Sequence, residues 1–208
     1  MPAERARGAR WAEKFESPTH VAKNRGTVAG VVPIDFGATF PAVVGNYISY
    51  EVSSILNRIA ISFVLDFYPN FAANDGAAHA LVDTTIGATY QVIKRSNNEL
   101  AMYIQTVGYL ISATYATFGP YWNISNRNTL VALFCSGNHA MYLNDNLLGT
   151  SAAATAVWNP SVLYVGTNAS NSAPANSRFT SLKIFTGNTA ADLLTAQEAY
   201  DYFHNRVF

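Results

Sequence analysis

The acidic residues that could carry out hydrolysis lack the spacing that this chemistry requires. An enzyme that cleaves a glycosidic bond uses an acid and a nucleophile or base about 5–9 Å apart. After residue 16 the chain has only three glutamates, Glu51, Glu99 and Glu198, and none stands in a paired pattern such as E-x-D-x-E or E-x-D-x-x-E. Glu198 is better explained as a helix cap, because Thr195 precedes it at capping-box spacing. We therefore predict that the protein is not an enzyme.

Metal ligands and an activated nucleophile are also missing from the sequence patterns. Asp66, Asp75 and Asp83 stand singly, and no D-x-D or D-x-N-x-D run would gather oxygen ligands around one calcium ion. These aspartates are expected to form turns in loops. No histidine pair has metal-binding spacing, and no G-x-S-x-G elbow is present. We predict no cofactor, with calcium as the one ion left open.

Aromatic and amide side chains gather near Gly119-Pro120 and leave two interpretations open. The aromatic residues are Tyr109, Tyr115, Tyr121 and Trp122, and the amides are Asn123, Asn126 and Asn128. An exposed platform of this kind could stack on a sugar ring and bond its hydroxyl groups. Alternatively, the aromatic rings lie in the core or in an interface.

The charge distribution limits the classes of partner. Only 12% of the residues are charged, against about 25% in an average soluble protein. Residues 1–25 have three more bases than acids and the remainder has three more acids than bases. A nucleic-acid binder needs a clustered basic patch, so nucleic acid is not an expected partner. No apolar run approaches the length of a membrane span, and the N-terminus lacks a signal-peptide pattern, so membrane insertion is not expected.

Alternating apolar residues and Gly, Asn, Asp and Pro punctuation predict many short strands after Thr27. Between Ile59 and Phe67 every second residue is large and apolar, which places one buried face on that strand. The predicted strands are 47–52, 59–68, 79–83, 89–95, 100–105, 109–115, 129–135, 140–144, 147–150, 163–167 and 179–185. Short strands at such regular spacing indicate an all-β antiparallel two-sheet jelly-roll sandwich.

The second half of the chain carries a series of motifs in a characteristic order. They are the hairpin Met141–Thr150, the segments Trp158-Asn159-Pro160, Leu163–Gly166 and Ser181–Phe185, and a short helix that begins at Thr195. This succession resembles the concanavalin A-like sandwich family in its laminin-G-like form, with its "LYVNGxLVG", "LYIG", "IxSIKIY" and "LSxxEI" segments. The resemblance implies one jelly-roll domain over residues 27–208, with one short C-terminal helix near 195–204.

The hairpin departs from this family at Asp145, where glycine is usual. A two-residue turn needs positive φ at both positions, which Asn-Asp tolerates less readily than Asn-Gly. A bulged or slightly longer turn is therefore predicted.

A basic N-terminal arm, residues 1–26, precedes the sandwich. Residues 3–16 can form an amphipathic helix with Trp11 and Phe15 on one face. We predict that these two rings, together with Arg7 and Arg10, dock on a partner or a neighbouring copy.

Low charge, the missing catalytic residues and the arm together favour a non-catalytic structural or adhesive subunit of a larger assembly. Stand-alone laminin-G-like domains of this kind are similar to bacteriophage decoration, cement or fibre proteins, which would place the protein in a virion. Its partners would then be other subunits, including copies of itself. The alternative is a lectin-like module that binds a glycan.

Overall fold

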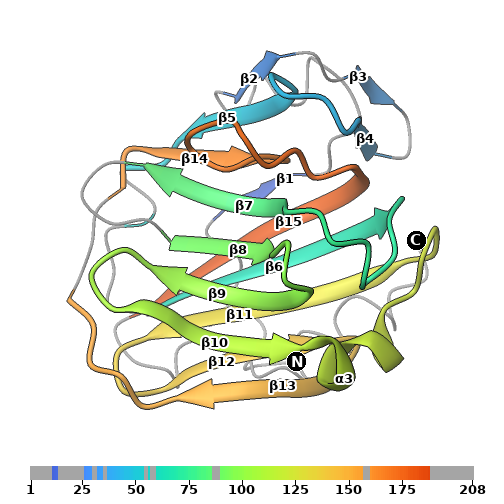
Figure 1. Cartoon of the computed structure of the whole chain (residues 1–208). Coiled ribbons are helices and arrows are strands. Elements are labelled where there is room, and N and C mark those ends of the chain that lie inside the picture. The colour runs from blue at the N-terminus through green and yellow to red at the C-terminus, as the bar shows by residue number, and fades with distance from the viewer. Residues whose placement is uncertain are drawn as a thin grey trace, which may run out of the picture.

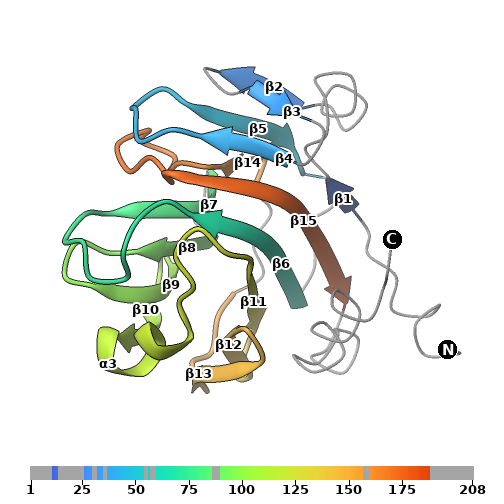
Figure 2. The same ribbon diagram turned by 90° about the vertical axis from the view of Figure 1, so that its right-hand side faces the viewer.

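The computed structural model describes residues 11–13, 26–29, 32–34, 37–53, 56, 60–85, 90–156 and 160–187. These residues form two antiparallel sheets packed face to face, and Figures 1 and 2 show the two layers from the front and from the side. The predicted all-β sandwich is confirmed. One short helix, α3 (Tyr115–Phe118), leads into a 3-10 turn, η1 (Gly119–Tyr121).

Sheet A forms the back layer in Figure 1. Its strands in spatial order are β13 (Asn146–Ser151), β12 (His139–Leu143), β11 (Asn128–Cys135), β6 (Ala60–Pro69), β15 (Ser177–Gly187), β4 (Gly37–Phe40) and β3 (Val32–Ile34), and β1 (Trp11–Glu13) also pairs with β15.

Sheet B forms the front layer. Its strands in spatial order are β10 (Gly108–Thr114), β9 (Glu99–Ile104), β8 (Tyr90–Lys94), β7 (His79–Thr85), β14 (Val162–Val165), β5 (Tyr47–Glu51) and β2 (Gly26–Ala29). Every strand predicted from residue 47 onward is present, with ends that agree within two residues.

The core lies between the sheets and is built by the alternation that the sequence shows. Phe63 and Phe67 of β6 point inward with their apolar neighbours on the same face. Phe134 of β11 meets Phe63 edge to face, with ring centroids 5.9 Å apart. Complete burial of one such side chain typically contributes about 1.5–3 kcal/mol, so this shared core is the main source of stability.

The opposite face of β6 is buried as well. A second apolar cluster on the outer face of sheet A contains Ala60, Val64, Val131, Leu133, Cys135, Ala140 and Phe185. Ser62 lies on this same face, is fully buried, and its hydroxyl has no hydrogen-bond partner among the residues that the structure describes. A buried hydroxyl without a partner loses its hydration and gains nothing in return.

Replacing this hydroxyl group should therefore stabilise the protein. We expect Ser62→Ala to raise the free energy of unfolding by about 1 kcal/mol, because the desolvation cost disappears. Urea unfolding monitored by circular dichroism measures the change. Ser177→Ala is the matched control, since Ser177 is equally buried but donates a 3.0 Å hydrogen bond to the Ala175 carbonyl oxygen. The control should lose stability, and an equal loss in both variants would contradict the prediction.

The N-terminal arm differs from its prediction where the structure describes it. Trp11, Ala12 and Glu13 form a strand that pairs with Ile184, Lys183 and Leu182 of β15. The predicted helix is therefore wrong at these three residues, and the arm joins sheet A there. Main-chain hydrogen bonds to the open side of β15 are available to a strand, whereas a short isolated helix is marginal in water.

Two other predictions on the terminal segments lie outside the described residues. The first is the docking role of Phe15, Arg7, Arg10 and the Trp11 side chain. The second is the C-terminal helix near 195–204.

The hairpin between β12 and β13 turns more tightly than predicted. Leu143 pairs with Asn146, so the turn has two residues, and Asn144 and Asp145 have φ angles of 47° and 72°. Both take the left-handed conformation that a primed turn requires. A register shift does occur, but inside the ladder, between Met141 and Tyr142.

Candidate functional site

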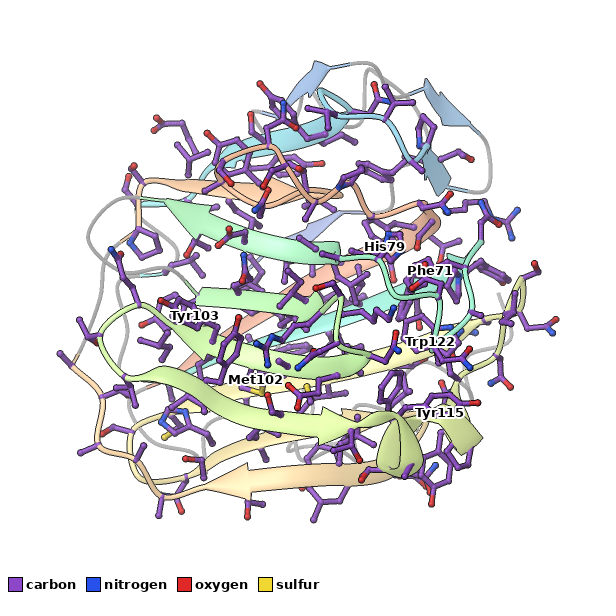
Figure 3. All side chains as sticks on the ribbon, in the orientation of Figure 1. Phe71, His79, Met102, Tyr103, Tyr115 and Trp122 are labelled. Atoms are coloured by element: carbon purple, nitrogen blue, oxygen red, sulfur yellow. The ribbon has the colours of Figure 1, made fainter. Side chains whose placement is uncertain are left out.

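Trp122 takes the second of its two predicted roles and lies in the core. It is 7% exposed, and its indole Nε1 donates a 3.1 Å hydrogen bond to the Phe71 carbonyl oxygen. Its ring packs against those of Phe67, Phe71 and Phe118. Trp122 is therefore not available to an exposed platform. Figure 3 shows Trp122 near Phe71 and His79.

The amides expected beside this platform belong to a segment that is tied to the β12–β13 hairpin. Asn128 Oδ1 accepts a hydrogen bond from the Asn123 backbone N–H, and Asn128 Nδ2 donates to the Asn126 carbonyl oxygen. Asn144 of the hairpin donates to the Tyr121 carbonyl oxygen at 2.7 Å. The predicted segment keeps one partly exposed ring, Tyr121, and its main chain is held by Asn128 and Asn144.

A different set of side chains lines up across the outer face of sheet B. Tyr109 pairs with Tyr103, Tyr103 with Gln91, and Tyr164 with both Asp83 and Ser49. Gln91 Nε2 donates to Asp83 Oδ2 at 2.9 Å, which closes the series. We call this set the sheet B row: Tyr109, Tyr103, Gln91, Asp83, Tyr164 and Ser49.

The row faces outward because the alternate residues of the same strands form the core. Val92, Met102 and Leu163 belong to the buried cluster between the sheets. Tyr103 is seen on β9 in Figure 3, away from the inner cluster around Trp122. Adjacent strands are about 4.8 Å apart, so the row from β10 to β5 spans about 24 Å.

Tyrosine rings flank the polar centre of the row. At one end, the rings of Tyr103 and Tyr109 meet at 5.1 Å, and the Arg95 guanidinium lies 4.0 Å above the Tyr109 ring. At the other end, Tyr47 meets Tyr164 at 5.5 Å. Tyr109 is 46% exposed. Aromatic rings whose faces reach solvent and whose hydroxyl groups can hydrogen-bond are suited to a ligand with both apolar and polar surfaces.

Asp83 fixes the centre of the row. Asp83 is 2% exposed, and its carboxylate accepts hydrogen bonds from Gln91 Nε2, the Thr84 N–H at 2.7 Å and the Ala169 N–H at 2.7 Å. The last bond joins the loop that follows β14 to sheet B. That loop is braced by its own Asn168, whose Oδ1 accepts from the Ser172 N–H at 2.7 Å. The sheet and the loop therefore hold the site in one geometry.

Burial raises the pKa of the Asp83 carboxyl group to about 6, although the three N–H donors oppose this shift. The native protein then holds this proton between pH 4 and 6, where the unfolded chain has released it. The stability that Asp83 contributes is therefore lost as the pH rises through this window, and its contribution no longer changes above it. Two pKa units correspond to about 3 kcal/mol.

We therefore expect the free energy of unfolding of the wild type, relative to Asp83→Asn, to fall by about 3 kcal/mol between pH 4 and 7. Urea unfolding of both proteins at each pH measures this difference. His139, whose pKa burial lowers, is present in both proteins, so its contribution cancels. A difference that does not change with pH would contradict the assignment.

The other two aspartates singled out in the sequence hold the structure together. Asp66 lies within β6 and accepts hydrogen bonds from Arg127, Thr129 and Ser181. Asp75 accepts from the Ala77 N–H in a turn and pairs with Lys94 and His79. The predicted turn role is thus right for Asp75 and wrong for Asp66 and Asp83, which are buried acceptors within strands.

Metal-binding clusters and membrane-spanning helices are both absent from the described part of the chain. No group of three or more His, Cys, Asp and Glu residues there is placed to hold a metal ion. No helix in the same residues is long and apolar enough to cross a membrane.

Comparisons with known proteins identify the fold. No protein-family model and no curated protein matches the chain. Among solved structures, the chain is similar to Trypanosoma rangeli sialidase in complex with sialic acid (TM-score 0.60, 13% identity), covering 84% of this chain but only 28% of the sialidase.

Two further structures cover most of the chain. One is domain 4 of AbnA, a GH43 extracellular arabinanase from Geobacillus stearothermophilus, in complex with arabinotriose (TM-score 0.60, 11% identity, 92% of this chain and 86% of that one). The other is the receptor-binding domain of botulinum neurotoxin mosaic serotype C/D (TM-score 0.65, 10% identity, 88% and 46%). At these identities the likeness shows the fold alone: the chain is a jelly-roll β-sandwich.

Proposed function

We propose that the protein is a non-catalytic, adhesive β-sandwich that binds carbohydrate on the outer face of sheet B. The observation that carries this proposal is the sheet B row, with Tyr103 and Tyr109 at one end and Tyr164 at the other. A sugar ring has apolar faces that pack on aromatic rings and hydroxyl groups that bond to amides and hydroxyls. Gln91 and Ser49 supply such polar groups between and beside the rings.

The rigidity of the site supports binding. Its side chains come from strands rather than from long loops, and Asp83 anchors both Gln91 and the loop at Ala169. A site that is already ordered loses little conformational entropy when a ligand arrives. Two of the similar structures are complexes with a sugar, sialic acid for the sialidase and arabinotriose for the arabinanase domain. These complexes support carbohydrate as the class of ligand.

A non-catalytic role fits the positions of the two glutamates on sheet B. Glu51 lies on β5 and Glu99 on β9, with β14, β7 and β8 between them. Four strand spacings amount to about 19 Å, well beyond the separation that glycoside hydrolysis uses.

Removing one ring of the row should weaken binding. We expect Tyr103→Ala to reduce the affinity for the bound oligosaccharide at least about tenfold, which corresponds to 1.4 kcal/mol. The probes are arabinotriose, cellotetraose, xylotetraose and lactose, each titrated calorimetrically against the full chain. Tyr115→Ala is the control, because Tyr115 is an exposed tyrosine that lies on α3, outside the sheet B row. Failure of every probe to bind, or equal weakening by the two variants, would contradict the proposed site.

The wider setting rests on the resemblance found in the sequence. We propose that the adhesive sandwich belongs to a larger assembly, such as a phage virion, in which it would meet copies of itself. Size-exclusion chromatography with light scattering tests this proposal. An oligomer supports it, and a monomer at all concentrations favours an independent binding module.

A further inference from the structure

We infer that the sheet B row selects neutral sugars and discriminates against sugars that carry a carboxylate. This inference rests on the proposed function and specifies its ligand class. The similar structures do not decide between the two ligand classes, because one contains an acidic sugar and another a neutral one. The inference is therefore based on the charges of the outer face of sheet B.

The described charged residues on this face are mostly acidic. Asp83 lies in the middle of the row, Glu51 is exposed at the end of β5, and Glu99 begins β9. Arg95, which directly follows β8, is the one cation among the described residues of this face. With all four groups ionised, these described residues give the face a formal excess of two negative charges.

The charge of Arg95 is already balanced. Its guanidinium bonds to the Glu99 carboxylate, and it also stacks on the Tyr109 ring. Glu99 accepts a further bond from Ser112 at 3.1 Å, so the pair forms part of a small network. An incoming carboxylate would have to compete with Glu99 for this arginine.

Asp83 has neutral donors only. The hydrogen-bond donors to its carboxylate are two backbone N–H groups and the Gln91 amide. Its negative charge is therefore not compensated by a neighbouring cation, and Glu51 adds a second acidic group two strands away. The loop beside Asp83, residues 166–176, contains no charged residue.

An acidic sugar on this face would lose hydration without gaining a free cation from the described residues, and it would be repelled by Asp83 and Glu51. A neutral sugar avoids both costs. Its hydroxyl groups can donate to and accept from Gln91, Ser49 and the tyrosine hydroxyls. The arrangement therefore favours a neutral oligosaccharide.

The test uses pairs of related oligosaccharides in which one member is neutral and the other carries a carboxylate. The full chain is applied to a printed glycan array in which neutral oligosaccharides stand beside acidic counterparts, including cellotetraose with β-1,4-glucuronotetraose and lactose with 3′-sialyllactose. For the pair with the strongest signal, calorimetry at 50 and 300 mM NaCl gives both affinities at pH 7.5. We expect the neutral member to bind at least about tenfold more tightly, and its affinity to change less than twofold with salt.

A charge reversal at an exposed position sharpens the result. Glu51→Lys should increase the affinity for the acidic member at least threefold and change the affinity for the neutral member less than twofold. In Glu51→Gln, the affinity for the acidic member should lie between those of the wild type and Glu51→Lys. Equal or tighter binding of the acidic member by the wild type overturns the selectivity. If that binding is still lost in Tyr103→Ala, the site stands and only its ligand class is wrong. Absence of binding to any sugar, or binding unaffected by Tyr103→Ala, overturns the proposed function as well.

Discussion

Gly166→Ala is expected to destabilise the protein by about 2–5 kcal/mol. Gly166 follows β14 with a φ of +87°, where a side chain is strained by about 1–2 kcal/mol. A Cβ atom there would also lie 2.0 Å from the Phe40 ring. Phe40 is fully buried and its ring packs against that of Phe179, with ring centroids 4.7 Å apart, so it cannot move without opening the core. Overpacking of this kind adds about 1–3 kcal/mol.

Gly137→Ala separates these two causes. Gly137 has a similar φ of +78°, but a Cβ atom there would meet nothing within 4 Å. The control should lose only the conformational term, about 1–2 kcal/mol. Chemical unfolding at constant m-value gives both numbers. Equal losses would show that the Phe40 contact relaxes, contrary to the packing described above.

Trp122→Ala should cost a similar amount, about 3–5 kcal/mol, because it leaves a large cavity in the core. The ring packs against Phe67, Phe71 and Phe118, and the variant also leaves the Phe71 carbonyl oxygen without its donor. Urea unfolding measures the loss.

Trp122→Phe serves as a partial variant that keeps much of the apolar volume. It should lose about 1–3 kcal/mol, mainly from the unpaired carbonyl group. Sugar affinity at the sheet B row should be unchanged in Trp122→Phe, because the indole does not belong to the row. If Trp122→Ala kept the stability of the wild type, this result would contradict the buried position of Trp122 and would favour the exposed aromatic platform considered from the sequence.

Strand positions were predictable because the signal for them is local. Period-two alternation and turn residues located the strands from residue 47 to the end of β15, and the motif order of the second half indicated the sandwich. The tight turn at Asp145 was not predicted, because the cost of positive φ at Asn144 and Asp145 is small against the pairing of the whole hairpin. The strand at Trp11–Glu13 depends on β15, which lies about 170 residues later, so local helical spacing gave the wrong answer there.

The candidate site could not be found in the same way because its members are brought together by register. Tyr103 and Tyr164 are 61 positions apart and become members of one row only when β9, β8, β7 and β14 pair as they do. The sequence does contain a signal, namely polar and aromatic residues at the outward positions of the predicted strands. The aromatic run at 121–122 was more conspicuous, but adjacency in sequence does not reveal which ring faces the core.

The most direct test of carbohydrate binding at the sheet B row is a two-dimensional ¹H–¹⁵N NMR titration of the full chain with the neutral oligosaccharide selected by calorimetry. We expect the largest chemical-shift changes on the outward residues of β7, β8, β9 and β14, including Gln91, Tyr103 and Tyr164, and on the loop at Ala169. The chemical shift of the Trp122 indole N–H should not change. Shift changes confined to α3, to residues 121–126 or to the β12–β13 hairpin would contradict carbohydrate binding at the sheet B row.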